Sequence, residues 1–260
     1  MDSSESRDRA GRVWAFRMRF EQEAALRFAR LAAELDALGA VAKVVTLARE
    51  AAEDERRHAA LCAALAARFG RRVANDDVPP PAPAAPSGLS PRERLLYEVV
   101  AMSCVTETLS AALLGAMLKR ATDNDVATTL RSILRDEVRH ARLGWAHLAG
   151  ETRRGGGAFI SETLPSMLAG TVDDEIFGSG ADAAEQYALG GLGALPRRER
   201  VEIFRTSMTE IVFPGLEHFG IDTTRGREWL DHSPGRCTSG SSDRAVERSD
   251  RAKPSSSSSS

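Results

Sequence analysis

The chain has 260 residues, of which 42% are hydrophobic, and its formal net charge at pH 7 is −2. This length suits one domain with an appendage, and the hydrophobic content is enough to form a packed core. No basic stripe with interleaved aromatic residues is present, so we expect no nucleic acid partner. No run of about 18 apolar residues is present either, so we expect no membrane-spanning helix and no membrane partner.

The first twelve residues are polar and charged, and they contain no apolar segment of the kind that directs secretion. We therefore expect a disordered N-terminus over residues 1–12 and a cytoplasmic location. The three cysteines are an odd number, and no two of them have Cys-x-x-Cys spacing. Neither a disulfide framework nor a zinc or iron–sulfur motif is predicted.

The helical periodicity of apolar residues predicts a first helix over residues 13–38 and a second over residues 42–69. Gly39 and Gly70 follow the last periodic residues and are expected to end these helices. Because the loop at Gly39 is short, the two helices should be antiparallel neighbours.

Residues 75–91 form a proline-rich segment, with six prolines between Pro79 and Pro91. This composition also suits a domain linker, but its length suits another role. About 15 residues of polyproline-like chain cover roughly 45 Å, and a 28-residue helix is about 42 Å long. We therefore predict a crossover that runs the length of a bundle and starts a third helix parallel to the second.

The third helix is predicted over residues 92–120, with Ser90 as its cap and Pro91 in its first turn. A turn over residues 121–125 leads into a fourth helix that ends near Gly150. The predicted fold is therefore all-α. It is a four-helix bundle over residues 13–150, made of two antiparallel hairpins joined by the long crossover.

The rest of the chain predicts further helices and a tail. Residues 151–230 are expected to form a helical extension packed on the bundle, with helices over residues 159–172 and 197–213. Pro196 opens the second of these, and Pro214 with Gly215 is expected to end it. Residues 231–260 are rich in serine, arginine and glycine, end in six serines and are expected to be disordered.

The pentapeptide Asp-Glu-x-Arg-His occurs twice, over residues 54–58 and 136–140, and each copy lies in a predicted helix. Residues three apart share one face of a helix. Glu55 with His58, and Glu137 with His140, therefore each offer a carboxylate and an imidazole to one point.

The first and third helices each add an inward glutamate. Glu21 lies on the apolar stripe of the first helix, whereas Glu23 shares its face with arginines and is expected to be solvated. Glu107 lies on the apolar stripe of the third helix. Glu21 precedes Glu55 by 34 residues and Glu107 precedes Glu137 by 30, which indicates an internal repeat of low identity.

Four carboxylates in one core need compensation, because burying one unpaired ion costs several kcal/mol. No arginine or lysine is predicted on the apolar stripes near them, and divalent cations also account for both histidines. An oxygen-rich set with two histidines favours iron or manganese over zinc. We expect two iron ions, with manganese as the alternative. The predicted metal ligands, contributed by all four helices, are Glu21, Glu55, His58, Glu107, Glu137 and His140. No catalytic residue beyond the ligands is predicted.

Asp54 and Asp136 each precede a predicted ligand glutamate. We predict that each accepts a hydrogen bond from the histidine of the opposite repeat and so fixes its tautomer.

On these residues, the segment from Arg12 to Gly150 resembles the ferritin-like diiron carboxylate superfamily, which includes ferritins, rubrerythrins and diiron oxygenases. The stretches 28–40 and 136–148 are similar to bacterial proteins known only as ferritin-like domain proteins. The resemblance implies that Glu55 and Glu137 bridge the two metals. It also implies that Glu21 and Glu107 are terminal ligands, each on one metal.

A single Glu-x-x-His pair on a helix is usually a surface ion pair, but two copies with matching upstream glutamates favour a metal site. The alternative is a bundle that no longer binds metal. His147 is expected in the core or at its rim, and His218 at the surface. Cys62 and Cys104 are expected to pack in the core.

The leading functional hypothesis is a diiron oxidoreductase that uses dioxygen or peroxide on further iron or on an unidentified small-molecule substrate. One alternative is iron handling by a ferroxidase, which for storage would need a hollow shell of about 24 copies by resemblance. The other is a bundle that uses metal only for stability. Residues 151–230 make a compact shell subunit less natural, and a homodimer stays open. A rubrerythrin-type peroxidase is disfavoured because Cys-x-x-Cys pairs are missing.

Overall fold

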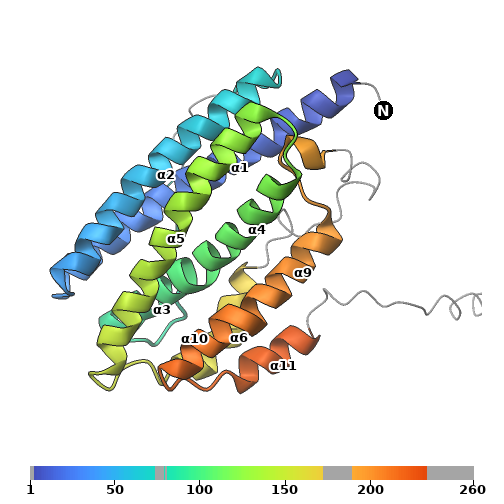
Figure 1. The fold of residues 1–260 in the computed structure, drawn as a ribbon. Helices are drawn as coiled ribbons and strands as arrows, with labels where there is room; N and C mark the ends of the chain where they lie inside the picture. Colours follow the sequence, from blue (N-terminus) through green and yellow to red (C-terminus); the bar gives the residue numbers. More distant parts are fainter. Residues whose placement is uncertain (1–2, 74–78, 80, 172–188, 233–260) are drawn as a thin grey trace, which may run out of the picture.

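The computed structural model describes residues 3–73, 79, 81–171 and 189–232, and within these residues it is all-α, with no β-strand (Figure 1). Four long helical rods form the bundle that the sequence predicts. They are α1 (Ser3–Ala37), α2 (Ala42–Arg68), α3 (Pro91–Val99) continuing through a π-helical segment (Val100–Thr106) into α4 (Glu107–Arg120), and α5 (Asn124–Thr152).

Helix α1 begins at Ser3, so the prediction of a disordered N-terminus over residues 1–12 is wrong from residue 3 onward. The reason is a contact with the end of α2 that the local sequence does not reveal. Ala10 is 1% exposed, and the Arg7 guanidinium lies over the Phe69 ring, 5.7 Å from its centroid. Arg7 also donates to the carbonyl oxygen of Arg68 at 3.0 Å. These contacts stabilise three further turns of helix.

The first hairpin turns where it was predicted to turn. Gly39 has a φ of 69° and Gly70 a φ of 90°, and the left-handed region favours glycine because it lacks a Cβ. The two helices pack against each other along their lengths. Their apolar core includes many alanines, which favour helix and allow close approach.

The third rod is parallel to α2. Arg92, at the start of α3, reaches the carbonyl of Leu38 beside the start of α2. At the other end, Arg68 of α2 pairs with Asp123 at 2.8 Å, between α4 and α5. Both ends of the two rods therefore coincide, as the crossover prediction requires.

Residues 79 and 81–90 of the predicted crossover are non-helical, and residues 74–78 and 80 lie outside the described part. Arg30 donates to the carbonyl of Pro81 at 2.9 Å, and the Ala84 N–H donates to Glu98 Oε1 at 3.0 Å. The segment is thus tied to α1 and α3. At its end Ser90 forms the predicted cap, accepting from the N–H of Glu93.

The π-helical segment within the third rod was not predicted. It lies against Gly144 of α5, where an added Cβ would meet Ser103 Cβ and Cys104 Sγ, each at 2.7 Å. Only glycine therefore allows this approach. The segment ends at Thr106, so Glu107 is the first residue after it.

Residues Pro91–Arg120 are long and apolar enough to cross a membrane by length and composition alone. Half of the most apolar 18-residue window is buried within the protein, and Glu107 in this stretch is 3% exposed. We assign the stretch as the core helix of the bundle.

The C-terminal helices lie on the α4 side of the bundle, away from α2 (Figure 1). They are α6 (Ile160–Thr171), α9 (Arg197–Ser207), a second π-helical segment (Met208–Val212), α10 (Phe213–His218) and α11 (Thr224–His232). Gly215 packs on the Trp145 ring of α5, and Trp14 Nε1 donates to the Leu192 carbonyl at 2.9 Å. These contacts attach the C-terminal helices to the bundle.

Two predicted boundaries in this region are wrong. The helix predicted to end before Pro214 continues to His218, because Pro214 lies in the first turn of α10, where a missing N–H is tolerated. Asp231 and His232, assigned to the disordered tail, are the last residues of α11. Residues 172–188 of the predicted extension and 233–260 of the predicted tail lie outside the described residues.

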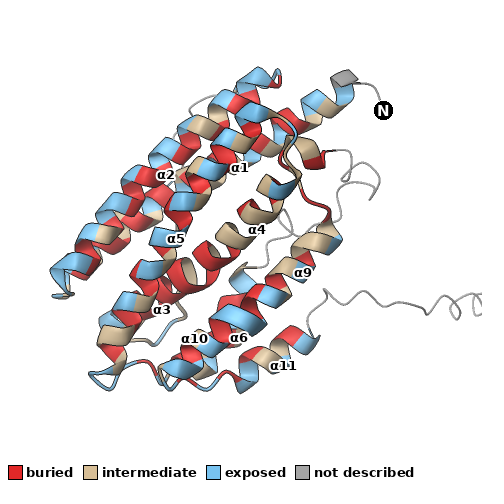
Figure 2. Ribbon diagram, viewed as in Figure 1, coloured by how far each residue is buried: buried red, intermediate tan, exposed pale blue. Residues whose placement is uncertain are grey.

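The buried apolar residues form two clusters. Figure 2 marks the buried residues along the helices in red. Met18 of α1 and Cys62 of α2 belong to one cluster. Phe28 of α1 and Ala52 of α2 belong to the other. The residues between these pairs include Glu21, Glu55 and His58, which are buried and polar. A polar layer therefore crosses the bundle at mid-height.

Candidate metal centre

The six residues predicted as metal ligands meet in this polar layer. Glu21 comes from α1, Glu55 and His58 from α2, Glu107 from the first turn of α4, and Glu137 and His140 from α5. None is more than 4% exposed. All four rods therefore aim polar side chains at one buried place, as the apolar stripes predict.

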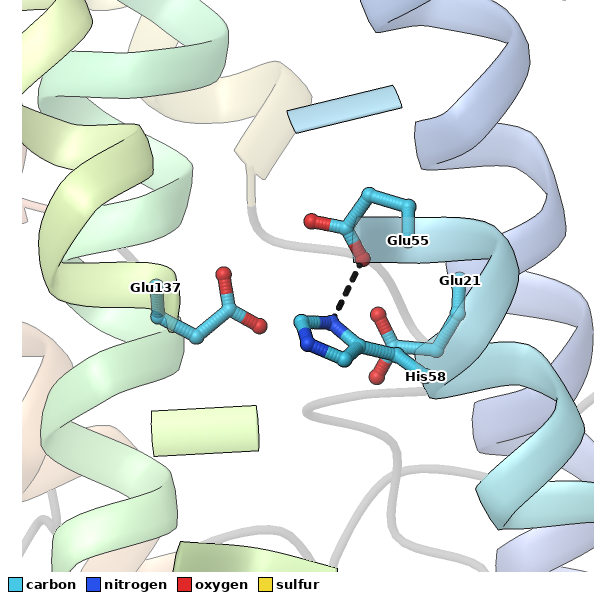
Figure 3. Close-up of side chains that lie close together, drawn as sticks. All are labelled: Glu21, Glu55, His58 and Glu137. Atoms are coloured by element: carbon cyan, nitrogen blue, oxygen red, sulfur yellow. Dashed lines mark hydrogen bonds and ion pairs between the residues drawn. The ribbon is translucent and has the colours of Figure 1, made fainter. Parts of the chain in front are cut away.

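The six side chains form two overlapping groups, each with ligand atoms within 4.8 Å of one another. The first group is Glu21, Glu55, His58 and Glu137, and Figure 3 shows these side chains turned toward one another from α1, α2 and α5. The second group is Glu55, Glu107, Glu137 and His140. Only Glu55 and Glu137 belong to both, which is the arrangement expected of two carboxylates between two ions.

Both histidines turn Nδ1 toward the carboxylates. His58 Nδ1 lies 3.1 Å from Glu55 Oε2, and His140 Nδ1 lies 3.2 Å from Glu137 Oε2. His140 Nδ1 is also 2.9 Å from Glu55 Oε1, an oxygen that is buried and accepts no hydrogen bond. A buried carboxylate oxygen without a hydrogen bond fits a site for a cation, because such an oxygen is otherwise costly.

The Nε2 atoms face away from the cluster, toward the two aspartates. His58 Nε2 lies 3.2 Å from Asp136 Oδ2, and His140 Nε2 lies 3.2 Å from Asp54 Oδ2. Each histidine therefore contacts the aspartate of the opposite repeat, which is the pairing that the sequence predicts. A carboxylate at Nε2 favours the N–H there and leaves Nδ1 free to coordinate.

Two arginines complete this outer layer, and sequence reasoning did not identify them. Arg57 Nη2 lies 2.8 Å from Asp54 and 2.6 Å from Asp136. Arg139 Nη2 lies 2.7 Å from Asp54 and 2.8 Å from Asp136. Each arginine bridges both aspartates, so the two repeats are cross-linked. The available signal was the arginine at the fourth position of both motif copies.

A hydroxyl group adds one further contact. Ser110, one turn after Glu107, donates to Glu137 Oε1 at 3.3 Å.

The electrostatics of the cluster favour added positive charge. Burial raises the pKa of Glu21 and of Glu107 well above the usual range, and repulsion from Glu55 and Glu137 raises both further. Burial acts to raise the pKa of Glu55 as well, but the contacts with His140 and His58 outweigh it and hold this pKa at about 2.

The neighbouring carboxylates raise the pKa values of both histidines. Burial acts to lower the pKa of His140, but contacts with Glu137 and Glu55 outweigh it and raise this pKa to about 10. The pKa of His58 is raised for the same reasons, with Glu55 as the main partner. The carboxylates therefore stabilise cations beside them, and divalent metals would supply the same compensation more fully.

One arginine lies nearer to the cluster than the sequence predicts. Arg17 precedes Glu21 by one turn and acts to lower its pKa, although burial has the larger effect. Its guanidinium also lies 3.2 Å from the sulfur of Met117. The assumption that no arginine lies near the glutamates therefore needs this correction.

Other acids and histidines lie outside the cluster. Glu23 and His218 are exposed, as predicted, and Glu53 of α2 is exposed as well. His147 is 6% exposed and belongs to the core, as predicted. Cys62 and Cys104 are fully buried among apolar side chains.

Two hollows lie away from the cluster. A groove of about 630 Å³ runs between α1 and α2 and is lined by Ala29, Ala33, Arg49 and Glu53 among others. A hollow of about 290 Å³ lies at the start of α3, beside Arg92 and Glu151. Neither is lined by any of the six residues.

Comparisons with known proteins concern the family and the fold. The family model described as Rubrerythrin matches residues 15–146. A solved structure, "Protein 19 with aldehyde deformylating oxidase activity from Synechococcus", is similar to this chain with a TM-score of 0.57. It is 17% identical, and the alignment covers 90% of this chain and 100% of that one. At this identity the likeness shows the fold. No curated protein matches the chain.

Proposed function

Because the chain belongs to the rubrerythrin family, within the ferritin-like diiron superfamily, we propose that its buried cluster binds two iron ions and that the protein is a dioxygen- or peroxide-dependent oxidoreductase. The observation that carries the proposal is the meeting of four glutamates and two histidines from four rods. The oxygen-rich donor set suits iron and, as an alternative, manganese.

Each residue has a proposed role. Glu55 and Glu137 would be shared by the two metal positions, since they belong to both groups of side chains. Glu21 and His58 would complete one position, and Glu107 and His140 would complete the other. Asp54 and Asp136 hold the imidazoles by Nε2, so that each Nδ1 stays turned toward the carboxylates. Bound iron would supply the electrons that reduce dioxygen or peroxide.

The chain's own side chains keep bulk water away from this chemistry. The six residues are nearly inaccessible, and the Phe28 ring packs 5.4 Å from the His140 ring. Water-excluded carboxylates interact more strongly with cations than solvated ones do.

Iron handling is the second candidate, with ferrous ions as the substrate. It is favoured by the burial of the cluster, whose six residues are at most 4% exposed, because small reactants reach a buried site more readily than bulky ones. The solved structure with aldehyde deformylating oxidase activity favours an organic substrate instead, since it has the same fold. A bundle that uses metal only for stability is the third candidate.

The test is oxygen consumption after anaerobic loading with ferrous iron. The wild type is expected to consume oxygen, and Glu55→Ala and His140→Ala are expected to lose most of this activity. Glu53→Ala is the matched control, since Glu53 is on the same helix as Glu55 but its side chain is 73% exposed. Equal oxygen consumption by all four proteins would contradict the proposal.

The same experiment separates the candidates. Continued consumption on adding excess ferrous iron supports iron handling, and consumption that ends after one turnover favours a separate organic substrate. Iron binding that raises the melting temperature without any oxygen consumption would leave only the metal-stabilised bundle.

A further inference from the structure

The exposed face of α5 above the candidate metal centre carries positive charge without exposed acids. Between Thr128 and Ala146, the exposed residues of α5 are Arg131, Arg135, Val138, Arg139 and Arg142. Their spacing of three or four residues places them on one stripe. Figure 2 shows this exposed side of α5 beside α2, away from the C-terminal helices. Together with Arg57 of α2, these residues form what we call the arginine face.

The positive charge of this face is only partly compensated. Among the described residues, the carboxylates within ion-pair distance of these arginines are those of Asp54 and Asp136, and both are buried. Arg131 and Arg142 make no ion pair with any residue that the structure describes. Five arginines therefore face two aspartates, in a chain whose formal net charge is −2. The excess of positive charge is local.

An apolar side chain lies at the centre of the arginine face. Val138 is 43% exposed, which is unusual here, since only five large hydrophobic residues of the described chain are exposed. Its neighbours on the stripe are arginines. An apolar centre within a ring of arginines is typical of protein interfaces, where arginine is enriched and lysine is depleted. It favours a protein partner over a nucleic acid.

The arginine face also has a polar link to the cluster. Arg57 is 45% exposed and lies 2.6 Å from Asp136, which in turn lies 3.2 Å from Nε2 of His58. Arg139 is 49% exposed and reaches His140 through Asp54 in the same way. Two polar contacts therefore separate each imidazole from the protein surface.

We propose that the arginine face docks the acidic surface of a one-electron donor protein. This rests on the proposed function, because reducing dioxygen or peroxide leaves oxidised iron that must be reduced again. Two electrons, delivered one at a time, return two ferric ions to two ferrous ions, and two donor molecules are each oxidised once. Charge complementarity steers the donor to the face that covers the histidines.

The test variant is Arg131→Glu/Arg142→Glu, since these arginines have no contact with the aspartates. Arg198→Glu/Arg225→Glu is the control, because both residues are exposed on C-terminal helices and the change in charge is equal. The probes are a reduced plant-type [2Fe–2S] ferredoxin, which is acidic, and reduced riboflavin, which is small and has no protein surface to dock. The rate at which oxidised, iron-loaded protein is reduced is measured at low and high salt.

With ferredoxin at low salt, the test variant is expected to react at least about tenfold more slowly than the wild type and the control variant. The difference should shrink at high salt, and all three proteins should react equally with riboflavin. Equal rates with ferredoxin would overturn the proposal. So would equal slowing with both reductants, or duplex DNA binding that the test variant loses while ferredoxin binding is unchanged.

Calorimetric titration with ferredoxin measures the binding affinity independently of the iron chemistry. If the protein binds no iron, the proposed function fails, yet the docking surface is still tested by this binding. Weaker binding in the test variant alone supports the surface, and equal binding in all three proteins rejects it.

Discussion

At the residue scale, the two Asp-Glu-x-Arg-His segments build one layer in which each position has a distinct partner. The glutamates and the Nδ1 atoms meet inside, the aspartates contact Nε2, and the arginines bridge both aspartates. Every polar atom of an imidazole thus has a carboxylate partner. This arrangement orients the histidines before any cation arrives, which lowers the entropic cost of binding.

The aspartate contact leads to a prediction about metal affinity. Asp54→Ala removes the acceptor at His140 Nε2, so the imidazole loses its fixed tautomer. The affinity for ferrous iron is expected to fall roughly 10- to 100-fold, as judged by anaerobic titration. Asp36→Ala, which removes only an exposed ion pair with Arg49, should bind like the wild type. Unchanged affinity in Asp54→Ala would show that the contact has no role at the metal.

The sequence identifies the glutamates of the cluster but not the arginines that surround it. Helical spacing identifies Glu21, Glu55, Glu107 and Glu137, because an acid on an apolar stripe is conspicuous. It does not identify Arg57 or Arg139, because arginines at partly exposed helix positions are usually solvated. In the structure both guanidinium groups are about half exposed. Their partners come from the other repeat, about 80 residues away, so only the fold shows the pairing.

At the element scale, the π-helical segment Val100–Thr106 is the feature that sets Glu107. A π-helical turn accommodates an extra residue and so changes the direction of the side chains that follow it. Gly144 provides the room that this segment needs. Apolar periodicity predicts one continuous α-helix for this rod, so it reveals neither the π-helical segment nor its contact with Gly144.

This contact predicts a large effect of a small substitution. Gly144→Ala places a methyl group 2.7 Å from Ser103 Cβ and Cys104 Sγ, so the segment must shift. Unfolding is expected to become easier by about 1–3 kcal/mol, and iron affinity should fall because Glu107 moves. Gly150→Ala in the same helix meets nothing within 4 Å and should be neutral or stabilising. Denaturant titration compares the two, and equal stability would contradict the contact.

A second element-scale prediction concerns pH. Arg92 holds the pKa of Glu151 below its usual range, with hydrogen bonds at 2.6 and 2.7 Å that outweigh the opposing effect of burial. A carboxyl group with a lowered pKa stabilises the fold above its unfolded pKa of about 4.3, and this contribution is lost as the pH falls through the folded value. Glu151→Gln should therefore lower the stability at pH 7 by about 1–2 kcal/mol.

The difference in unfolding free energy between the wild type and Glu151→Gln should shrink as the pH is lowered from 5 toward 3. Chemical unfolding at each pH measures this difference. Glu53→Gln, which affects an exposed pair with Arg56, should show little difference at any pH. A gap that stays constant with pH would mean that the charge of Glu151 is not the cause.

Helix boundaries show the limit of local sequence at this scale. The polar residues before Val13 predict a solvated N-terminus, but Phe69 provides a surface that holds Arg7 and Ala10 in a helix. Pro214 predicts a helix end, but the preceding π-helical segment changes the hydrogen-bond register and places the proline where no N–H is needed. Both errors come from contacts and register, which composition does not encode.

At the whole-molecule scale, two helical hairpins, a crossover and a C-terminal helical layer surround one polar centre. The bundle was predictable because its apolar period, glycine stops and crossover length agree. The placement of the C-terminal helices was not, since it depends on packing such as that of Gly215 on Trp145. The layer covers the α4 side and leaves α2 and the front of α5 open (Figure 1).

This coverage predicts the size of the assembly. A shell of about 24 copies, expected for iron storage, would elute near half a megadalton. We expect the 28.0 kDa chain to elute as a monomer or homodimer, because the C-terminal layer occupies one whole side of the bundle. Size-exclusion chromatography with light scattering decides this. Elution as a large shell would favour iron storage.

The central claim is that the six buried side chains hold two metal ions, and crystals soaked anaerobically in ferrous iron test it directly. Anomalous diffraction at the iron absorption edge should show two peaks per chain, both beside Glu55 and Glu137. One peak should lie against Nδ1 of His58 and the other against Nδ1 of His140. Peaks confined to exposed acids, or none within the bundle, would contradict the account.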